Sequence, residues 1–216
     1  MRRLWVISLL VAALAVGGCG SGPASVSTDF TLAISGWDHA SVDGATELRA
    51  DSGESDVSYS WQATDGTFDT STGDRVVWKA PGSVGQRVVT LTGTRAGTTK
   101  ETAMTVTVKS SPVTIAGWEL VDDLIGGKDA SVTIRNDSSK TINALKVRMV
   151  MWNNFGERVT RLGDYVFHGI ASDIAIEPGN SKTSTWSLYW ATGVTQIIPW
   201  VYEVAFTDAS VWKLED

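Results

Sequence analysis

The feature that most limits the fold of this chain is a pattern of short, alternating runs that begins at Phe30. Apolar and polar residues alternate through Val57, Tyr59, Trp61 and Ala63, which is typical of a strand with one buried face. Gly, Asp, Asn or Ser interrupts such runs about every ten residues, and no stretch keeps helical apolar spacing over several turns. The pattern predicts an all-β protein.

A boundary between two β units is expected at Lys109–Pro112. The proline cannot continue a central strand, and the polar residues before it are typical of a hinge. The units would span residues 30–109 and 113–216, each close to the ~100 residues of an immunoglobulin-like sandwich. Ile34–Asp38 and Ile115–Glu119 are similar, which fits either two related modules or a coincidence.

The N-terminal segment has the features of a signal peptide. Two arginines precede the 13 largely apolar residues Leu4–Val16, a run shorter than the ~20 residues that span a bilayer. Small residues before Cys19 resemble the lipobox of bacterial lipoproteins. The resemblance implies a cleaved signal peptide at residues 1–18, followed by a lipidated cysteine and flexible tether at residues 19–29.

Cys19 is the only cysteine of the chain, so it has no partner for an intramolecular disulfide. The resemblance implies two or three acyl chains on this cysteine, carried by its sulfur and its new amino terminus, which would hold the protein on membrane lipid almost permanently. The expected location is the extracytoplasmic face of a bacterial membrane. Because Gly20 is not aspartate, the lipoprotein resemblance implies the outer membrane if the organism is Gram-negative.

Two short motifs in the first unit resemble bacterial Ig-like domains of the polycystic-kidney-disease type. They are Trp61–Phe68, which matches strand C and its turn, and Trp78–Gly82, which matches a W-x-A-P step. The resemblance implies that Trp61 is the buried tryptophan of strand C. Without a disulfide beneath it, hydrophobic packing alone would hold these sheets together.

Four motifs in the second unit resemble FxLYD-related bacterial extracellular domains. The motifs are Asn136–Ile142, Trp152–Gly156, Ile176–Gly179 and Phe206–Ala209. Trp152 replaces the tyrosine of that pattern, and Ala209 replaces the glycine that follows Asp208. The resemblance implies a β-sandwich of cell-surface lipoproteins whose activity is unassigned. We therefore expect two tandem immunoglobulin-like sandwiches after the signal peptide.

The inventory of reactive side chains argues against an enzyme. His39 and His168 are the only histidines and fall in different units, and none of the common nucleophile, phosphate-loop or zinc motifs occurs. A net charge of −6 also argues against nucleic acid as partner, because binding phosphates requires a basic surface.

Calcium is the one cofactor that the sequence raises. Asp51, Glu54 and Asp56 fall in one loop, and carboxylate oxygens are ligands that Ca²⁺ prefers. The spacing does not match an EF-hand, and acidic loops are common on any acidic sandwich. A calcium-stabilised surface spacer therefore stays open as one alternative, with no cofactor as the leading expectation.

Aromatic residues supply the candidate binding surface. Exposed rings stack on sugars or anchor protein partners, although most rings here are expected in the core. Strand parity with Val204 and Phe206 places Trp200 and Tyr202 in that core. The candidates are Trp152, Trp186, Tyr189 and Trp190, of which Trp152 and Trp190 are expected to be exposed. A non-catalytic module for binding, adhesion or assembly with an envelope protein leads, and a module that binds carbohydrate or cell-wall glycan is the alternative.

Overall fold

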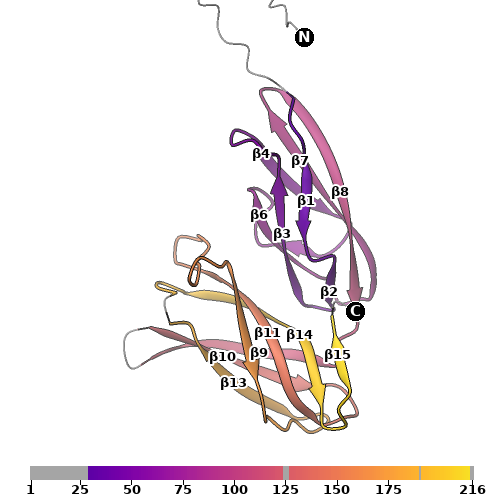
Figure 1. Cartoon of the computed structure of the whole chain (residues 1–216), viewed down its shortest axis with the longest axis vertical. Helices are drawn as coiled ribbons and strands as arrows, with labels where there is room; N and C mark the ends of the chain where they lie inside the picture. Colours follow the sequence, from indigo (N-terminus) through magenta and orange to yellow (C-terminus); the bar gives the residue numbers. More distant parts are fainter. Residues whose placement is uncertain (1–28, 124–126, 190, 215–216) are drawn as a thin grey trace, which may run out of the picture.

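The alternating runs form strands of two sandwiches, and the prediction of an all-β, immunoglobulin-like fold is confirmed (Figure 1). The computed structural model describes residues 29–123, 127–189 and 191–214. Each sheet draws all its strands from one side of residues 110–112, so the sequence before this point forms a first unit and the sequence after it a second unit. Within these described ranges, no helix is long and apolar enough to cross a membrane.

The first unit packs a sheet of order β1-β3-β6-β5 against a sheet of order β2-β8-β7-β4. Its strands are β1 (Ala33–Gly36), β2 (His39–Ser41), β3 (Ala45–Asp51), β4 (Ser58–Ala63), β5 (Thr67–Phe68), β6 (Arg75–Lys79), β7 (Gly85–Arg95) and β8 (Thr98–Lys109). Strand β1 belongs to the first of these sheets, where it pairs with β3. Strand β2 belongs to the second sheet, where it pairs parallel to β8.

Two tryptophans fill the middle of the first unit. Trp61 is 2% exposed and its Nε1 donates to the carbonyl oxygen of Gly73 at 2.9 Å, which confirms its expected burial. Trp78 is fully buried and donates from Nε1 to the carbonyl oxygen of Asp65 at 3.0 Å. Both rings thereby satisfy their polar atom while adding large apolar surfaces to the core.

The second unit packs a sheet of order β13-β10-β9 against a sheet of order β12-β11-β14-β15. Its strands are β9 (Val113–Asp122), β10 (Lys128–Asn136), β11 (Ile142–Trp152), β12 (Val166–Ala171), β13 (Ser181–Ser187), β14 (Gln196–Phe206) and β15 (Val211–Lys213). In the sequence of β11, Leu145, Val147, Met149 and Met151 recur at every second position, which predicts that they share one face. All four lie in the core of the second unit.

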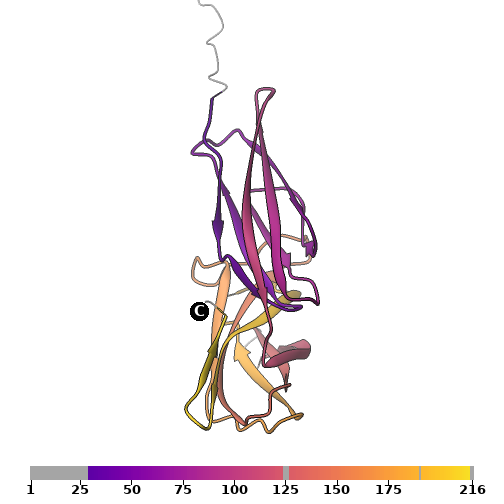
Figure 2. The same ribbon diagram turned by 90° about the vertical axis from the view of Figure 1, so that its right-hand side faces the viewer.

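The two units meet over a third apolar cluster, which we call the joint (Figures 1 and 2). The outer face of β11 and β14 in the second unit lies against the outer face of β3 and β6 in the first. Members of the joint are Trp37, Ala45, Val77, Val150, Trp152, Val166, Ile198 and Trp200. These strands are therefore buried on both faces near the joint.

The expectation that Trp200 and Tyr202 point into the sandwich core is wrong. The pairing of β14 with β11 shifts register so that Tyr202 is an extra residue between Val201 and Glu203. This bulge reverses the alternation, since an inserted residue moves every later side chain to the other face. Val201 and Val204 lie in the core of the second unit, whereas Trp200 is buried in the joint.

Candidate binding surfaces

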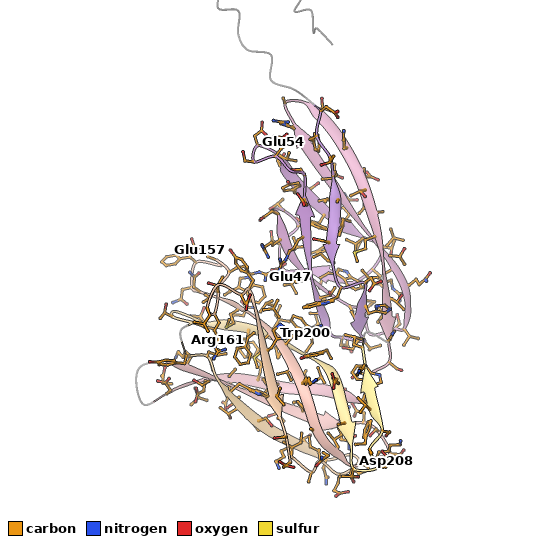
Figure 3. The ribbon with its side chains drawn as sticks, in the orientation of Figure 1. Glu47, Glu54, Glu157, Arg161, Trp200 and Asp208 are labelled. Atoms are coloured by element: carbon orange, nitrogen blue, oxygen red, sulfur yellow. The ribbon has the colours of Figure 1, made fainter. Side chains whose placement is uncertain are left out.

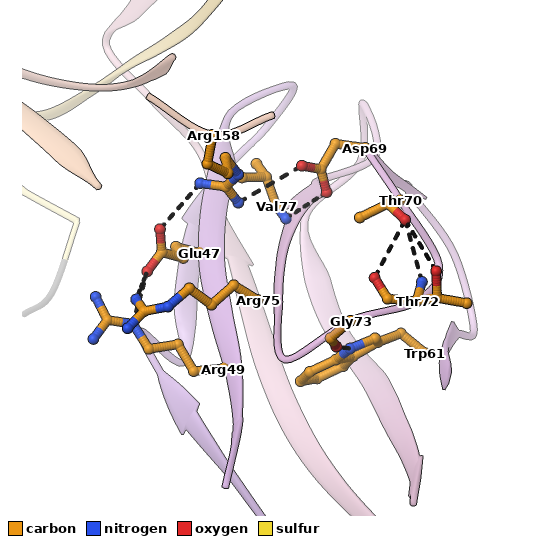
Figure 4. A network of polar contacts seen from close by, with 10 residues as sticks. All are labelled: Glu47, Arg49, Trp61, Asp69, Thr70, Thr72, Gly73, Arg75, Val77 and Arg158. Atoms are coloured by element: carbon orange, nitrogen blue, oxygen red, sulfur yellow. Dashed lines mark hydrogen bonds and ion pairs between the residues drawn. The ribbon is translucent and has the colours of Figure 1, made fainter. Parts of the chain in front are cut away.

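A buried carboxylate lies at the centre of the joint. Strand β3 places Glu47 on the outer face of its sheet, where the second unit reduces its exposure to 3%. Its Oε1 accepts from Arg49 Nε at 2.7 Å and from Arg75 Nη1 at 3.3 Å, and its Oε2 accepts from Arg158 Nη1 at 3.2 Å (Figure 4). Removing a carboxylate from water is costly, and these three cations compensate that cost.

Two of these arginines bridge the units. Arg158 belongs to the second unit and also approaches Asp69 of the first, with 3.6 Å between Nη2 and Oδ2. Arg75 belongs to the first unit, and its guanidinium lies 4.4 Å from the ring centre of Tyr165 in the second. Cation and aromatic face attract each other most strongly where water is excluded.

A third arginine crosses the joint without using Glu47. Arg148 projects from the outer face of β11 and is 6% exposed. Its guanidinium lies 3.5 Å from the ring centre of Trp37 in the first unit and 4.0 Å from that of Tyr202 in the second. A planar guanidinium suits such a stacked position better than a lysine ammonium does.

The loop between β11 and β12 presents an exposed phenylalanine. Asn153 Oδ1 accepts from the backbone N–H of Phe155 at 2.9 Å and of Glu157 at 3.0 Å, and Gly156 adopts a φ of +74°. These bonds fix the turn, while the Phe155 side chain is 87% exposed. A large apolar side chain held out by an ordered turn is a candidate contact with a partner.

Two more exposed apolar residues lie in the same loop and in the loop between β13 and β14. Leu162 is 76% exposed with a φ of +54°, and Tyr189 is 41% exposed. Arg161 ties the two loops together, since its Nε donates to the carbonyl oxygen of Tyr189 at 3.2 Å. We call Phe155, Leu162 and Tyr189 the apolar pole. Figure 3 shows Glu157 and Arg161, which belong to these loops, on the side of the second unit away from Asp208.

A cavity of about 320 Å³, the interunit cavity, opens where the outer face of β1 and β3 meets β12. Its walls are formed by Ser35, Gly36, Trp37, Glu47, Arg49 and Val166. A smaller cavity of about 120 Å³ lies beside the linker between the units, with Trp200 and Val113 in its wall. The first of these carries an exposed cation, Arg49, and so has the more specific chemistry.

The structure separates the predicted aromatic candidates. The expected exposure of Trp152 is wrong, because this ring is 8% exposed and lies in the joint. Trp186 is also 8% exposed, and its Nε1 donates to the carbonyl oxygen of Ile170 at 3.0 Å in the core. Tyr189 belongs to the apolar pole, and Trp190 lies outside the described residues. The three described rings therefore do not form one shared platform.

Two of the three predicted calcium ligands form ion pairs with one arginine. Arg95 pairs with Glu54 at 3.0 Å and with Asp56 at 2.8 Å, while Asp51 Oδ1 accepts from the N–H of Gly53. In the described ranges, no three His, Cys, Asp or Glu side chains are placed to hold a metal ion. Cys19, the predicted lipidation site, lies outside those ranges.

Alternation within single strands does not predict the joint or the arginines beside it. The available signal was the near-continuous apolar character of the second half of β11 and the first half of β14, which is typical of strands covered on both faces. Val150 and Trp152 fall on the polar side of the predicted alternation, yet both are apolar. Apolar residues on both faces of these two strands indicate that another folded unit packs on the sheet.

Residues 130–216 match a family described as a family of unknown function, DUF5780. No curated protein matches the chain.

Solved structures with partial similarity include a hypothetical protein of Peptoclostridium difficile 630, with 16% identity, a TM-score of 0.39 and coverage of 49% of this chain and 87% of that one. The Yersinia pseudotuberculosis adhesin InvE has 15% identity, a TM-score of 0.31 and coverage of 89% and 60%. The Bacillus thuringiensis chitinase ChiA74 has 15% identity, a TM-score of 0.28 and coverage of 83% and 30%.

Proposed function

We propose that this chain is a lipid-anchored, non-catalytic binding protein on the extracytoplasmic face of a bacterial membrane. Lipidation at Cys19 would fix one end, and the apolar pole of the second unit would contact a protein partner in the envelope. The exposure of Phe155 on its ordered turn is the observation that carries this proposal.

The joint supports a role that depends on fixed geometry. Three arginines beside its apolar cluster each contact both units, namely Arg75, Arg148 and Arg158. A flexible tether would let the protein reach around its anchor, with a typical span of ~15–20 Å for residues 20–28. Beyond the tether, the joint would keep the apolar pole at a constant position relative to the first unit.

The form of the apolar pole favours a protein over a glycan as partner. Glycan binding by aromatic platforms uses flat rings aligned in a groove, whereas Phe155 and Leu162 project from separate turns. Protein interfaces commonly centre on a few protruding apolar or aromatic side chains that enter pockets of the partner. Phe155, Leu162 and Tyr189 are of this kind.

Site-specific photo-crosslinking in the native host tests the protein contact. A benzophenone side chain at position 162 should give a discrete crosslinked product, and Phe155→Ser in the same chain should abolish it. Because Phe155 is 87% exposed, this substitution should change stability by less than about 0.5 kcal/mol. The control is the same probe at Val211, which is 52% exposed at a different part of the second unit.

Equal crosslinking at positions 162 and 211, or a product at 162 that survives Phe155→Ser, would contradict the proposed contact. The anchor is tested separately by mass spectrometry of the native N-terminal peptide, which should carry acyl chains on Cys19. Cys19→Ala should then move the protein from the membrane fraction to the soluble one. An unmodified sulfur would remove the anchor from the proposal.

A further inference from the structure

We propose that the interunit cavity binds the charged group of an acidic saccharide, a carboxylate or a phosphate, through the guanidinium of Arg49. This site differs from the apolar pole and does not depend on the protein contact proposed above. It lies between the units, so it exists only while the joint is formed.

Strand pairing places the polar groups of this cavity side by side. Ser35 on β1 lies directly opposite Arg49 on β3, and Glu47 lies two residues before Arg49 on the same face of β3. The Nε of Arg49 is held at 2.7 Å by Glu47, while the side chain remains 47% exposed. Figure 4 shows the two terminal nitrogens of Arg49 turned away from Glu47. A guanidinium fixed at Nε in this way presents a pair of parallel donors.

The network of ion pairs beside the cavity contains one cation in excess. Glu47 and Asp69 are the two carboxylates of the network, and Arg49, Arg75 and Arg158 are its three guanidiniums. Both oxygens of Glu47 are occupied, so its charge is already compensated inside the joint. Arg49 is the most exposed of the three arginines and is therefore the group that an anion from solution would reach first.

An acidic residue limits how much negative charge the site accepts. Asp51 follows Arg49 by two residues on β3, and its Oδ1 accepts from the N–H of Gly53. Its carboxylate lies on the same face of the strand and would repel a second anionic group. The site therefore suits a single charge on an otherwise neutral molecule, and the overall net charge of −6 also disfavours polyanions.

The remaining walls suit a sugar ring. Trp37 and Val166 contribute apolar surface and Ser35 contributes a hydroxyl, which matches the apolar faces and hydroxyl edges of a saccharide. The backbone approaches closely at Gly36, where an added Cβ would lie 2.4 Å from the carbonyl oxygen of Glu47. At about 320 Å³, the cavity falls at the lower end of the ~300–1,000 Å³ range of small-molecule sites.

Calorimetric titration of the full mature chain in detergent tests the site. Each acidic probe carries a single charge: galacturonate supplies the carboxylate, and the methyl phosphodiester of glucose 6-phosphate supplies the phosphate. Maltotriose is the neutral saccharide. At least one acidic probe should bind saturably and more tightly than maltotriose. Arg49→Gln should weaken that binding about tenfold, because it removes charge-assisted hydrogen bonds.

Arg135→Gln is the matched control. Arg135 is 51% exposed and its Nε contacts Asp137 at 2.6 Å, so it repeats the pairing of Arg49 with Glu47 outside any interunit contact. Its substitution should leave the affinity unchanged. Because Arg49→Gln also alters the joint, Arg49→Lys and the melting temperature of each variant are measured in parallel. Folded Arg49→Lys should retain part of the affinity, since it keeps the charge but loses the planar fork.

Binding of only one acidic probe supports the proposal and identifies its anionic group. Absence of saturable binding by both acidic probes would overturn it, and so would equal weakening by Arg135→Gln or equal binding of maltotriose. An Asp-rich peptide that binds through Arg49 when neither saccharide does would also overturn it, in favour of a protein ligand. None of these outcomes alters the crosslinking expected at the apolar pole.

Discussion

Asn136 connects three segments of the second unit through one buried side chain. Its Nδ2 donates to the carbonyl oxygens of Lys140 at 2.7 Å and Ile176 at 2.8 Å, and its Oδ1 accepts from the N–H of Ser138 at 3.0 Å. The residue is fully buried, so these groups have no access to water as a substitute partner. This accounts physically for the asparagine at the start of the Asn136–Ile142 motif.

Asn136→Ala should therefore lower the free energy of unfolding by about 2–4 kcal/mol, since it removes the three hydrogen bonds of a fully buried side chain at once. Urea unfolding followed by tryptophan fluorescence measures the effect. Asn154→Ala, in an exposed turn, is the matched control and should change stability by less than about 0.5 kcal/mol. Equal effects of the two substitutions would refute a structural role for the Asn136 side chain.

Ala209 occupies a backbone conformation that favours glycine. Its φ is +66°, and it replaces the glycine of the pattern that the second unit resembles. Ala209→Gly should raise the free energy of unfolding by about 0.5–1 kcal/mol, because it relieves the steric cost of the Cβ. Ala103→Gly on β8 should be destabilising instead, as glycine weakens a strand interior. A destabilised Ala209→Gly variant would contradict the strain.

Asp208 gives the turn between β14 and β15 a pH dependence. The pKa of Asp208 lies well below the ordinary range of a carboxyl group because Lys140 donates to it, as do the hydroxyl and N–H of Ser210. A lowered pKa in the folded state means that the charged form stabilises the fold above the unfolded value of about 3.9, and that this contribution disappears as the pH falls.

The melting temperature of Asp208→Asn should therefore fall below that of the native chain at pH 7, and the difference should shrink as the pH falls below about 4. Thermal melts across this range measure it. Glu101→Gln, on an exposed position of β8, removes the same charge and serves as control. A difference that stays constant with pH would exclude the ionised Asp208 as its cause.

At the level of elements, β4, the strand C of the first unit, supplies a central residue of the sandwich core. Trp61 on β4 is 2% exposed and packs with its ring centre 6.4 Å from that of Phe68. Trp61→Ala should cost about 3–5 kcal/mol, a large share of the ~5–15 kcal/mol that stabilises a domain. Denaturant unfolding tests this, with exposed Val84→Ala as control. An unchanged transition midpoint would refute the core assignment.

Strands β11 and β14 show where alternation predicts burial and where it does not. On β11, Leu145, Val147, Met149 and Met151 face the core as predicted, because the strand keeps its own period of two and pairs with β12 without a register shift from Leu145 to Val150. On β14, the bulge at Tyr202 breaks the period, and Trp200 turns to the joint. A bulge depends on how two strands pair, which apolar periodicity within one strand does not report.

At the scale of the whole molecule, the joint should make the two units unfold together. Calorimetry of the native chain should give one transition, because Trp200, Val150 and Val77 share buried surface across the units. Trp200→Ala should remove about 3–5 kcal/mol and separate the melting of the units. Trp61→Ala, which removes an equally large ring within one unit, is the control. Two transitions in the native chain would contradict the coupling.

The sequence alone determined the β class of the chain, the burial of Trp61 and the inward face of β11. These features follow from local alternation and turn residues, which act over a few neighbours in the chain. Only the tertiary structure decided that Trp152, Trp200 and Glu47 are buried where the two units meet. Strand parity placed Trp200 in the sandwich core, and it does not report what covers an outer face. Whether an outer face meets water or another unit depends on how two folded bodies pack, and contacts between distant segments set that packing.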